Sequence, residues 1–270
     1  MDLKRIIPSI YTSDGQFAQT ESREHVLDYN EALERAIAYE GQGADELIIM
    51  DVTTIAERRR NLPKFLKDLT KTLKIPIVFG GGIHTDKDVE AMLKLGLQKI
   101  YVNSAAVRNP ALITKITQKY GSESLVVAID TRKTFGSWKV YLNGGKSRTE
   151  IDLLNWVEMI QLRGAGEILV STIARTTVNH EEVIEILKDI RQTCKVPFLA
   201  SVGAKTVQDF VDAFQQAEVD GIVSGHYFMQ EDTSIDALKQ ALISEGINVS
   251  LLNHLSSSGI VDTEPDARED

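Results

Sequence analysis

Four short segments rich in glycine, serine and asparagine could bind phosphate, because each follows an apolar run that is typical of a strand. Their candidate phosphate-binding residues are Gly81, Gly82, Asn103, Ser104, Ser201, Gly203, Gly225 and His226. Glycine lets backbone N–H groups approach an anion without a Cβ in the way, and serine or asparagine adds side-chain donors. The segments therefore predict phosphate binding, although the same glycines would also suit tight turns after strands.

Two further polar residues end predicted strands and point toward the same end of the fold. Asp51 and Ser171 are candidate substrate-binding residues. Asp51 could orient ligand hydroxyls, or it could cap a helix. The sequence contains no cluster of His, Cys, Asp and Glu with metal-ligand spacing, so we expect neither a metal nor a cofactor.

Short runs rich in Val, Ile and Leu alternate with longer amphipathic segments along the chain. The predicted strands are Arg5–Ile10, Glu46–Asp51, Ile75–Phe79, Lys99–Val102, Leu125–Asp130, Glu167–Ser171, Val196–Ala200 and Gly221–Ser224. The predicted helices include Tyr29–Gln42, Leu62–Thr72, Asp86–Leu95, Pro110–Tyr120, Ile151–Arg163, His180–Thr193 and Thr206–Ala217. Strict alternation of this kind predicts a parallel sheet with right-handed crossovers. Eight units close most economically into a single (β/α)₈ TIM barrel, with an open doubly wound sheet as the alternative.

An internal repeat favours the barrel. The run QGADELI at 42–48 resembles RGAGEIL at 163–169, and IPIVFGGG at 75–82 resembles VPFLASVG at 196–203. Corresponding glycines in both pairs are separated by the same 121 residues. The first four units thus match the last four, which indicates a duplicated half-barrel. Two phosphate sites related by this repeat predict an elongated ligand with a phosphate at each end.

Composition excludes several other classes of protein. The chain has 270 residues, a net charge of −9 and a pI of about 5.2, which disfavours nucleic-acid and membrane-surface binding. The single cysteine, Cys194, excludes an internal disulfide. The N-terminal residues lack the apolar core of a signal peptide, so we expect a cytoplasmic protein. We expect residues 1–252 to form the barrel and the polar, acidic segment 253–270 to be a disordered tail.

Specific motifs in the barrel segment resemble the HisF family, the cyclase subunit of imidazole glycerol phosphate synthase. The matching runs include KRIIP at 4–8, DVT at 51–53, FGGGIH at 79–84, VNSAAV at 102–107, VVAID at 126–130 and RGAGEIL at 163–169. The resemblance implies a partner glutaminase (HisH-like) subunit at the N-terminal face of the barrel, and a phosphorylated small-molecule ligand. It also implies a reaction in which ammonia is added to a ribulosyl carboxamide bisphosphate, which is cleaved and cyclised to imidazole glycerol phosphate.

In that family, ammonia enters through the bottom of the barrel past a ring of charged residues. The matching positions are Arg5, Glu46, Lys99 and Glu167, and each stands at the start of a predicted strand. The resemblance implies that these four residues form an ammonia gate. The alternative is that opposite charges only seal the barrel floor, held there by one another.

The residues that would carry out the chemistry depart from the family pattern. The family has an aspartate at the end of the first strand and another at the end of the fifth; the matching residues here are Tyr11 and Asp130. A tyrosine, with a pKa near 10, is a poor base at neutral pH. Gln19 replaces a loop lysine, Thr176 replaces an aspartate near the substrate, and His226 matches a phosphate-binding serine after one inserted residue.

Three functions are consistent with these residues. The first is a HisF-like subunit that accepts ammonia from a glutaminase but does not carry out standard imidazole glycerol phosphate formation. The second is a genuine cyclase of histidine biosynthesis that tolerates Tyr11 and uses Asp130. The third is a catalytically silent phosphate-binding or regulatory barrel.

Overall fold

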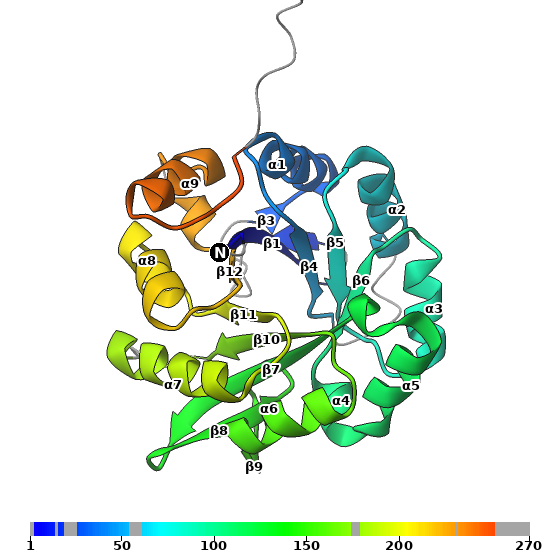
Figure 1. Cartoon of the computed structure of the whole chain (residues 1–270). Coiled ribbons are helices and arrows are strands. Elements are labelled where there is room, and N and C mark those ends of the chain that lie inside the picture. The colour runs from blue at the N-terminus through cyan, green and yellow to red at the C-terminus, as the bar shows by residue number, and fades with distance from the viewer. Residues whose placement is uncertain are drawn as a thin grey trace, which may run out of the picture.

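The computed structural model describes residues 3–13, 16–18, 26–53, 61–173, 179–230 and 232–251. Eight parallel strands form the inner ring, and helices surround it (Figure 1). The barrel strands are β1 (Arg5–Ser13), β4 (Leu47–Asp51), β5 (Ile77–Gly80), β6 (Lys99–Val102), β7 (Leu125–Thr134), β10 (Glu167–Thr172), β11 (Phe198–Ser201) and β12 (Gly221–Ser224). The helices are α1 (Tyr29–Gly41), α2 (Leu62–Thr72), α3 (Asp86–Leu93), α4 (Ser104–Arg108), α5 (Ala111–Tyr120), α6 (Leu153–Leu162), α7 (His180–Thr193), α8 (Val207–Gln216) and α9 (Ile235–Ser244), with 3₁₀ turns η2 (Ser122–Ser124) and η3 (Tyr227–Met229).

The sheet closes on itself through two parallel pairings. β1 pairs with β12, so that Arg5 lies opposite Gly221. β7 pairs with β10, so that Asp130 lies opposite Ser171. With both pairings made, the eight strands leave no free edge, and the predicted (β/α)₈ barrel is confirmed over the open sheet.

Apolar side chains fill both sides of the barrel wall, because alternate residues of a strand point to opposite faces. Outward-pointing residues pack against the helices and form the larger core. Inward-pointing residues form a smaller cluster, which we call the inner apolar layer. Its buried members are Ile7, Ile48, Met50, Val78, Val126, Ala128, Leu169, Leu199 and Val223, with Tyr11 and Tyr101 packed against them. The barrel interior is therefore filled by side chains, as expected for eight strands.

The two halves of the barrel repeat the same local geometry. Gly82 and Gly203 have φ angles of 65° and 66°, a left-handed conformation that favours glycine. Thr85 and Thr206 each begin a helix with a capping box, in which the side chain accepts from the aspartate N–H three residues later. Since both pairs are separated by the repeat spacing, the predicted half-barrel duplication is confirmed.

An antiparallel extension of β7 was not expected from the sequence. β7 continues to Thr134 and turns into β8 (Ser137–Leu142) and β9 (Ser147–Asp152), and β2 (Gln16–Ala18) and β3 (Val26–Leu27) form a smaller extension beside β1. Phe135 and Gly136 make the β7–β8 turn with positive φ angles of 51° and 80°. The helix expected from Ile151 begins at Leu153, because Asp152 ends β9 and caps the helix. The expected tail lies outside the described residues.

A buried lysine on helix α9 forms hydrogen bonds with residues from the first quarter of the sequence. The ammonium of Lys239, whose side chain is 1% exposed, donates to the carbonyl of Gly43 (2.6 Å), to the carboxylate of Asp45 (2.8 Å) and to the hydroxyl of Ser250 (3.1 Å). Asp45 also accepts the backbone N–H of Ile6 at 2.7 Å. This network joins α9, the loop before β4 and the start of β1.

We predict that Lys239→Met lowers the free energy of unfolding by about 3–5 kcal/mol, because it leaves the Asp45 carboxylate without its cation. Urea unfolding of both proteins measures the difference. Lys94→Met is the control, since Lys94 forms an exposed pair with Glu90, and we expect it to change stability little. Equal effects of the two substitutions would contradict a stabilising role for the buried network.

Candidate functional site

Four charged side chains form a closed ring at the N-terminal end of the barrel. The Arg5 guanidinium lies 2.5 Å from Glu46 and 2.5 Å from Glu167. The Lys99 ammonium lies 3.1 Å from Glu46 and 3.0 Å from Glu167. The signs alternate around the ring, so its formal charge is zero. We call these four residues the floor ring.

Burial makes each charge in the floor ring depend on its neighbours. The glutamate side chains are 6% exposed and those of Arg5 and Lys99 are 21% exposed. Burial alone lowers the pKa of Arg5, but the two glutamate charges outweigh it and raise that pKa above its ordinary value. The charged form of Arg5 is therefore favoured, and the ion pairs hold the four side chains close together. Passage of ammonia through the floor ring stays a prediction.

At the opposite end of the barrel, a cleft of about 170 Å³ opens over β11 and β12. Tyr11, Ser201, Gly203, Val223, Ser224, Gly225 and His226 line it. The cleft thus brings together all four predicted phosphate-binding residues of the second half-barrel with Tyr11, one of the two predicted catalytic residues. The Ser224 hydroxyl accepts the N–H of Tyr227 at 3.2 Å and holds the turn beneath the cleft.

Glycines in the two halves stand in different surroundings. A Cβ at Gly203 would meet no atom within 4 Å, so the space above this backbone is open. A Cβ at Gly81 would collide with the carbonyl oxygen of Asp51, and one at Gly80 would collide with the Tyr101 ring. Packing alone therefore accounts for glycine at positions 80 and 81, whereas Gly203 leaves room for a ligand against the main chain.

The predicted phosphate residues of the first half are partly engaged by the protein itself. The Ser104 hydroxyl accepts the N–H of Asn143, which follows β8, at 2.9 Å. Asn103 precedes α4, and its buried Oδ1 has no hydrogen-bond partner among the described residues. A buried polar atom without a partner is uncommon in folded proteins, and a bound donor would satisfy it. Gly82, with its positive φ, completes this half of the mouth.

The Asp51 carboxylate forms hydrogen bonds that position the loop after β4. One carboxylate oxygen accepts the hydroxyl of Thr12 at 3.0 Å, the N–H of Thr53 at 3.1 Å and the hydroxyl of Thr53 at 2.5 Å. Asp51 is buried and ties β4 to β1. Capping the turn that follows its own strand is therefore an observed role for this carboxylate, and contact with a ligand stays a prediction.

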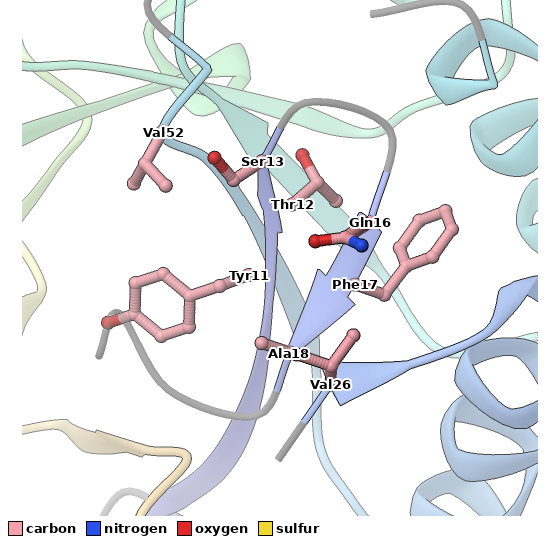
Figure 2. A pocket seen from close by; sticks show the side chains of 8 residues that line it. All are labelled: Tyr11, Thr12, Ser13, Gln16, Phe17, Ala18, Val26 and Val52. Atoms are coloured by element: carbon pink, nitrogen blue, oxygen red, sulfur yellow. The ribbon is translucent and has the colours of Figure 1, made fainter. Parts of the chain in front are cut away.

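Tyr11 projects from the inner face of β1. Figure 2 shows Tyr11 and Ser13 on one side of the strand, with Val52, while Thr12 and Phe17 lie on the other. The Tyr11 ring packs on the inner apolar layer and borders the cleft. On β7, Asp130 is half-buried and stands opposite Ser171 of β10 in the strand register. The two predicted catalytic positions thus sit on separate strands of the same mouth.

A second inward tyrosine was missed by sequence reasoning. Tyr101 on β6 packs against the inner apolar layer beside Gly80, the last residue of β5. Its alternation with the inward Lys99 would have identified it, because residues two apart on a strand share a face. Thr176 and Gln19, which we expected to depart from the family pattern, lie outside the described residues.

Comparison with known proteins identifies the family. The sequence model of the family described as "Histidine biosynthesis protein" matches residues 5–234. A protein from Flavobacterium johnsoniae named "Imidazole glycerol phosphate synthase subunit HisF" is 36% identical over 248 residues, which cover 92% of this chain and 99% of that protein. The chain belongs to the HisF family. Proteins of the same name from Natranaerobius thermophilus (36% identical) and Flavobacterium psychrophilum (37%) cover equal shares.

HisF membership agrees with the barrel and its duplicated halves. Among the described residues, no helix is both long and apolar enough to cross a membrane, and no three His, Cys, Asp or Glu side chains are grouped as a metal site. Cys194 is buried, its thiol lies 3.3 Å from the carbonyl of Val196, and burial raises its thiol pKa. These features give Cys194 a structural place in the HisF-type barrel.

We predict that Arg5→Met destabilises the protein by about 3–5 kcal/mol at pH 7, because two buried glutamates must then share Lys99. Repulsion between them raises the folded-state pKa of one glutamate above its unfolded value near 4.3. The protonated form is favoured below that pKa, so the deficit relative to the parent protein shrinks as pH falls from 7 to 5. Urea unfolding at both pH values measures it.

Lys115→Met is the matched control for this experiment, since it removes one cation from an exposed pair with Asp86. We expect that change to have a small effect at either pH. A loss of stability in Arg5→Met that is small, or that does not depend on pH, would show that the floor ring is not held together by its charges.

Proposed function

We propose that this chain is a HisF-type synthase subunit that binds a bis-phosphorylated small molecule at its mouth and receives ammonia through its floor. The observation that carries the proposal is the pairing of the cleft at the mouth with the closed floor ring, at opposite ends of one barrel. The open main chain at Gly203, beside the hydroxyl of Ser201, suits a phosphate. His226 adds a group that binds anions best when protonated.

The floor of the barrel also has the properties of a docking surface for a glutaminase. Leu3 precedes β1, Leu162 ends the helix before β10, and Leu251 lies two residues after Val249, which bridges to Lys4. These three side chains are 56%, 89% and 45% exposed. Exposed apolar residues around the floor ring favour a protein partner at this face. A glutaminase bound there would release ammonia next to the ring.

Proton transfer at the mouth is the part that departs from the family. A pair of carboxylates can divide the work of general acid and general base. Here Asp130 can serve as one of them, but Tyr11 can donate a proton and is a weak base at neutral pH. The tyrosine ring also occupies part of the space beside the phosphate cleft. We therefore propose that the mouth binds such a bisphosphate but does not carry out standard imidazole glycerol phosphate formation.

Standard imidazole glycerol phosphate synthesis is the second candidate function. The relatives that carry this name align over nearly their full length, and Asp130 is retained. In that case substrate groups would replace the missing carboxylate. Reaction rates separate the two candidates.

We predict that, with the bisphosphate substrate of the synthases and saturating ammonium, turnover is about 10²–10⁴-fold below that of a relative with an aspartate at the position of Tyr11, because one acid/base group is absent. Free ammonium replaces the ammonia that a glutaminase would supply, so the assay measures only the reaction at the mouth. Product formation is followed by chromatography and mass spectrometry.

The double substitution Tyr11→Asp with Thr176→Asp tests the cause of this low rate. If the rest of the mouth still fits the substrate, turnover rises toward that of the relative; no gain would indicate a changed substrate pocket. Asp130→Asn in the same background is the control and abolishes any gain. Parent turnover equal to that of the relative would overturn the proposal in favour of histidine biosynthesis.

We predict that a glutaminase subunit co-purifies with the tagged full-length chain from its native cell, and that Leu162→Glu greatly reduces its recovery by placing a charge on the apolar rim of the floor. Quantitative mass spectrometry of the eluates measures recovery. Phe135→Glu is the matched control, since Phe135 is 92% exposed at the tip of the β7–β8 turn, far from the floor. Absence of a glutaminase in all eluates would indicate that the floor ring is only structural.

A further inference from the structure

Strands β7, β8 and β9 form an antiparallel extension that continues the inner face of the barrel wall beyond its rim. Asp130 lies on the inner face of β7, and Arg132, two residues on, shares that face. In β8, Tyr141 pairs with Asp130 and Lys139 pairs with Arg132. The opposite face carries the buried side chains Thr131 and Val140. We call the side bearing Arg132, Lys139 and Tyr141 the upper wall of the mouth.

Arg132 is held rigidly on the upper wall. Its guanidinium stacks 4.8 Å from the centroid of the Tyr141 ring, and its Nε–H donates to the carbonyl of Ile173 at 3.0 Å. The Tyr141 ring is itself buried, with its hydroxyl 2.9 Å from the hydroxyl of Thr134. Two contacts thus fix the plane of the guanidinium. Its two terminal NH₂ groups make no hydrogen bond within the described part of the chain.

Lys139 places a second cation directly across from Arg132. Like charges opposite one another on neighbouring strands destabilise a sheet. Among the described residues, neither Arg132 nor Lys139 forms an ion pair. Asp152, opposite Lys139, accepts the N–H groups of Leu154 and Asn155 at the start of α6. At the rim, two cations thus lie opposite one another, and neither is paired with a carboxylate of the described residues.

We propose that Arg132 and Lys139 form an anion site for a phosphate or carboxylate group carried by the ligand. A fixed guanidinium presents parallel N–H donors that match either group, and an ammonium adds charge without demanding one geometry. In the ring of strands, β10 separates β7 from β11, so the site lies on the same rim as the glycine-rich turns of β11 and β12. It would hold a third anionic group, or position the one nearest Asp130. This rests on the proposed function only in placing the ligand at the mouth.

The test measures anion binding without turnover. Isothermal titration calorimetry with pyrophosphate and, separately, with succinate is run on the full chain at low ionic strength. The variant is Arg132→Met with Lys139→Met. The control, Lys133→Met with Lys188→Met, removes the same charge from exposed side chains that contact Glu182 and Gln216. We expect the variant to bind at least one probe about tenfold or more weakly than the parent, and the control to match the parent.

The preferred probe identifies the ligand class: selective loss of pyrophosphate binding indicates a phosphate, and selective loss of succinate binding indicates a carboxylate. Thermal melting is the second readout. Without anion, Lys139→Met alone should melt higher than the parent, because the repulsion is relieved, and the probe should raise the melting temperature of the parent more than that of this variant.

Unchanged affinity for both probes in the double variant would overturn the site, as would an equal loss in the control. These results do not depend on a glutaminase or on turnover. A failed ammonia assay alongside retained anion binding therefore contradicts the proposed function and leaves the site in place.

Discussion

The closed ring of Arg5, Glu46, Lys99 and Glu167 is the constraint on which the two ends of this barrel depend. Four charges are held at the base of an otherwise apolar interior, and each is stable there because its neighbours have the opposite sign. Glu46 and Glu167 occupy corresponding positions in the two half-barrels, whereas Arg5 and Lys99 do not. The duplication thus supplies the acids, and separate strands supply the cations. A ring with any other sum of charges would leave an uncompensated charge buried below the inner apolar layer.

Above the inner apolar layer, the two half-barrels differ in how much space is open around the turns that follow their strands. In the second half, the main chain at Gly203 and the turn after β12 border a cleft. In the first half, Asp51, Tyr101 and Asn143 contact or crowd the corresponding turns. Tyr11 stands beside the open half, where its bulky ring borders the cleft. The two halves of one duplicated fold thus present different surfaces at the mouth.

Much of this arrangement follows from patterns of the sequence. Short apolar runs with a 121-residue repeat predict the eight strands, the closed barrel and the correspondence between Gly82 and Gly203. The resemblance to the HisF family implies the four residues of the floor ring, and their place at strand starts lets opposite charges meet around the barrel axis. The strands and the repeat depend on periodicity, which a single sequence carries directly.

Other features depend on contacts between residues far apart in the chain. The hydrogen bonds from Thr12 and Thr53 to the Asp51 carboxylate could not be predicted from the position of Asp51 at a strand end. A carboxylate at that position suits ligand binding equally well. The β8–β9 extension was hidden because the helix pattern that follows it begins near Ile151, where β9 is still running. The stacking of Arg132 on Tyr141 requires the register of an antiparallel pair, which the sequence of either strand alone does not set.

The central proposal is that the mouth of the barrel binds a bis-phosphorylated ligand. Calorimetric titration of the full chain with the bisphosphate substrate of the imidazole glycerol phosphate synthases, without ammonia, tests it most directly. The account predicts saturable binding of one molecule per chain, weakened by added inorganic phosphate. An absence of saturable binding at millimolar substrate would contradict it.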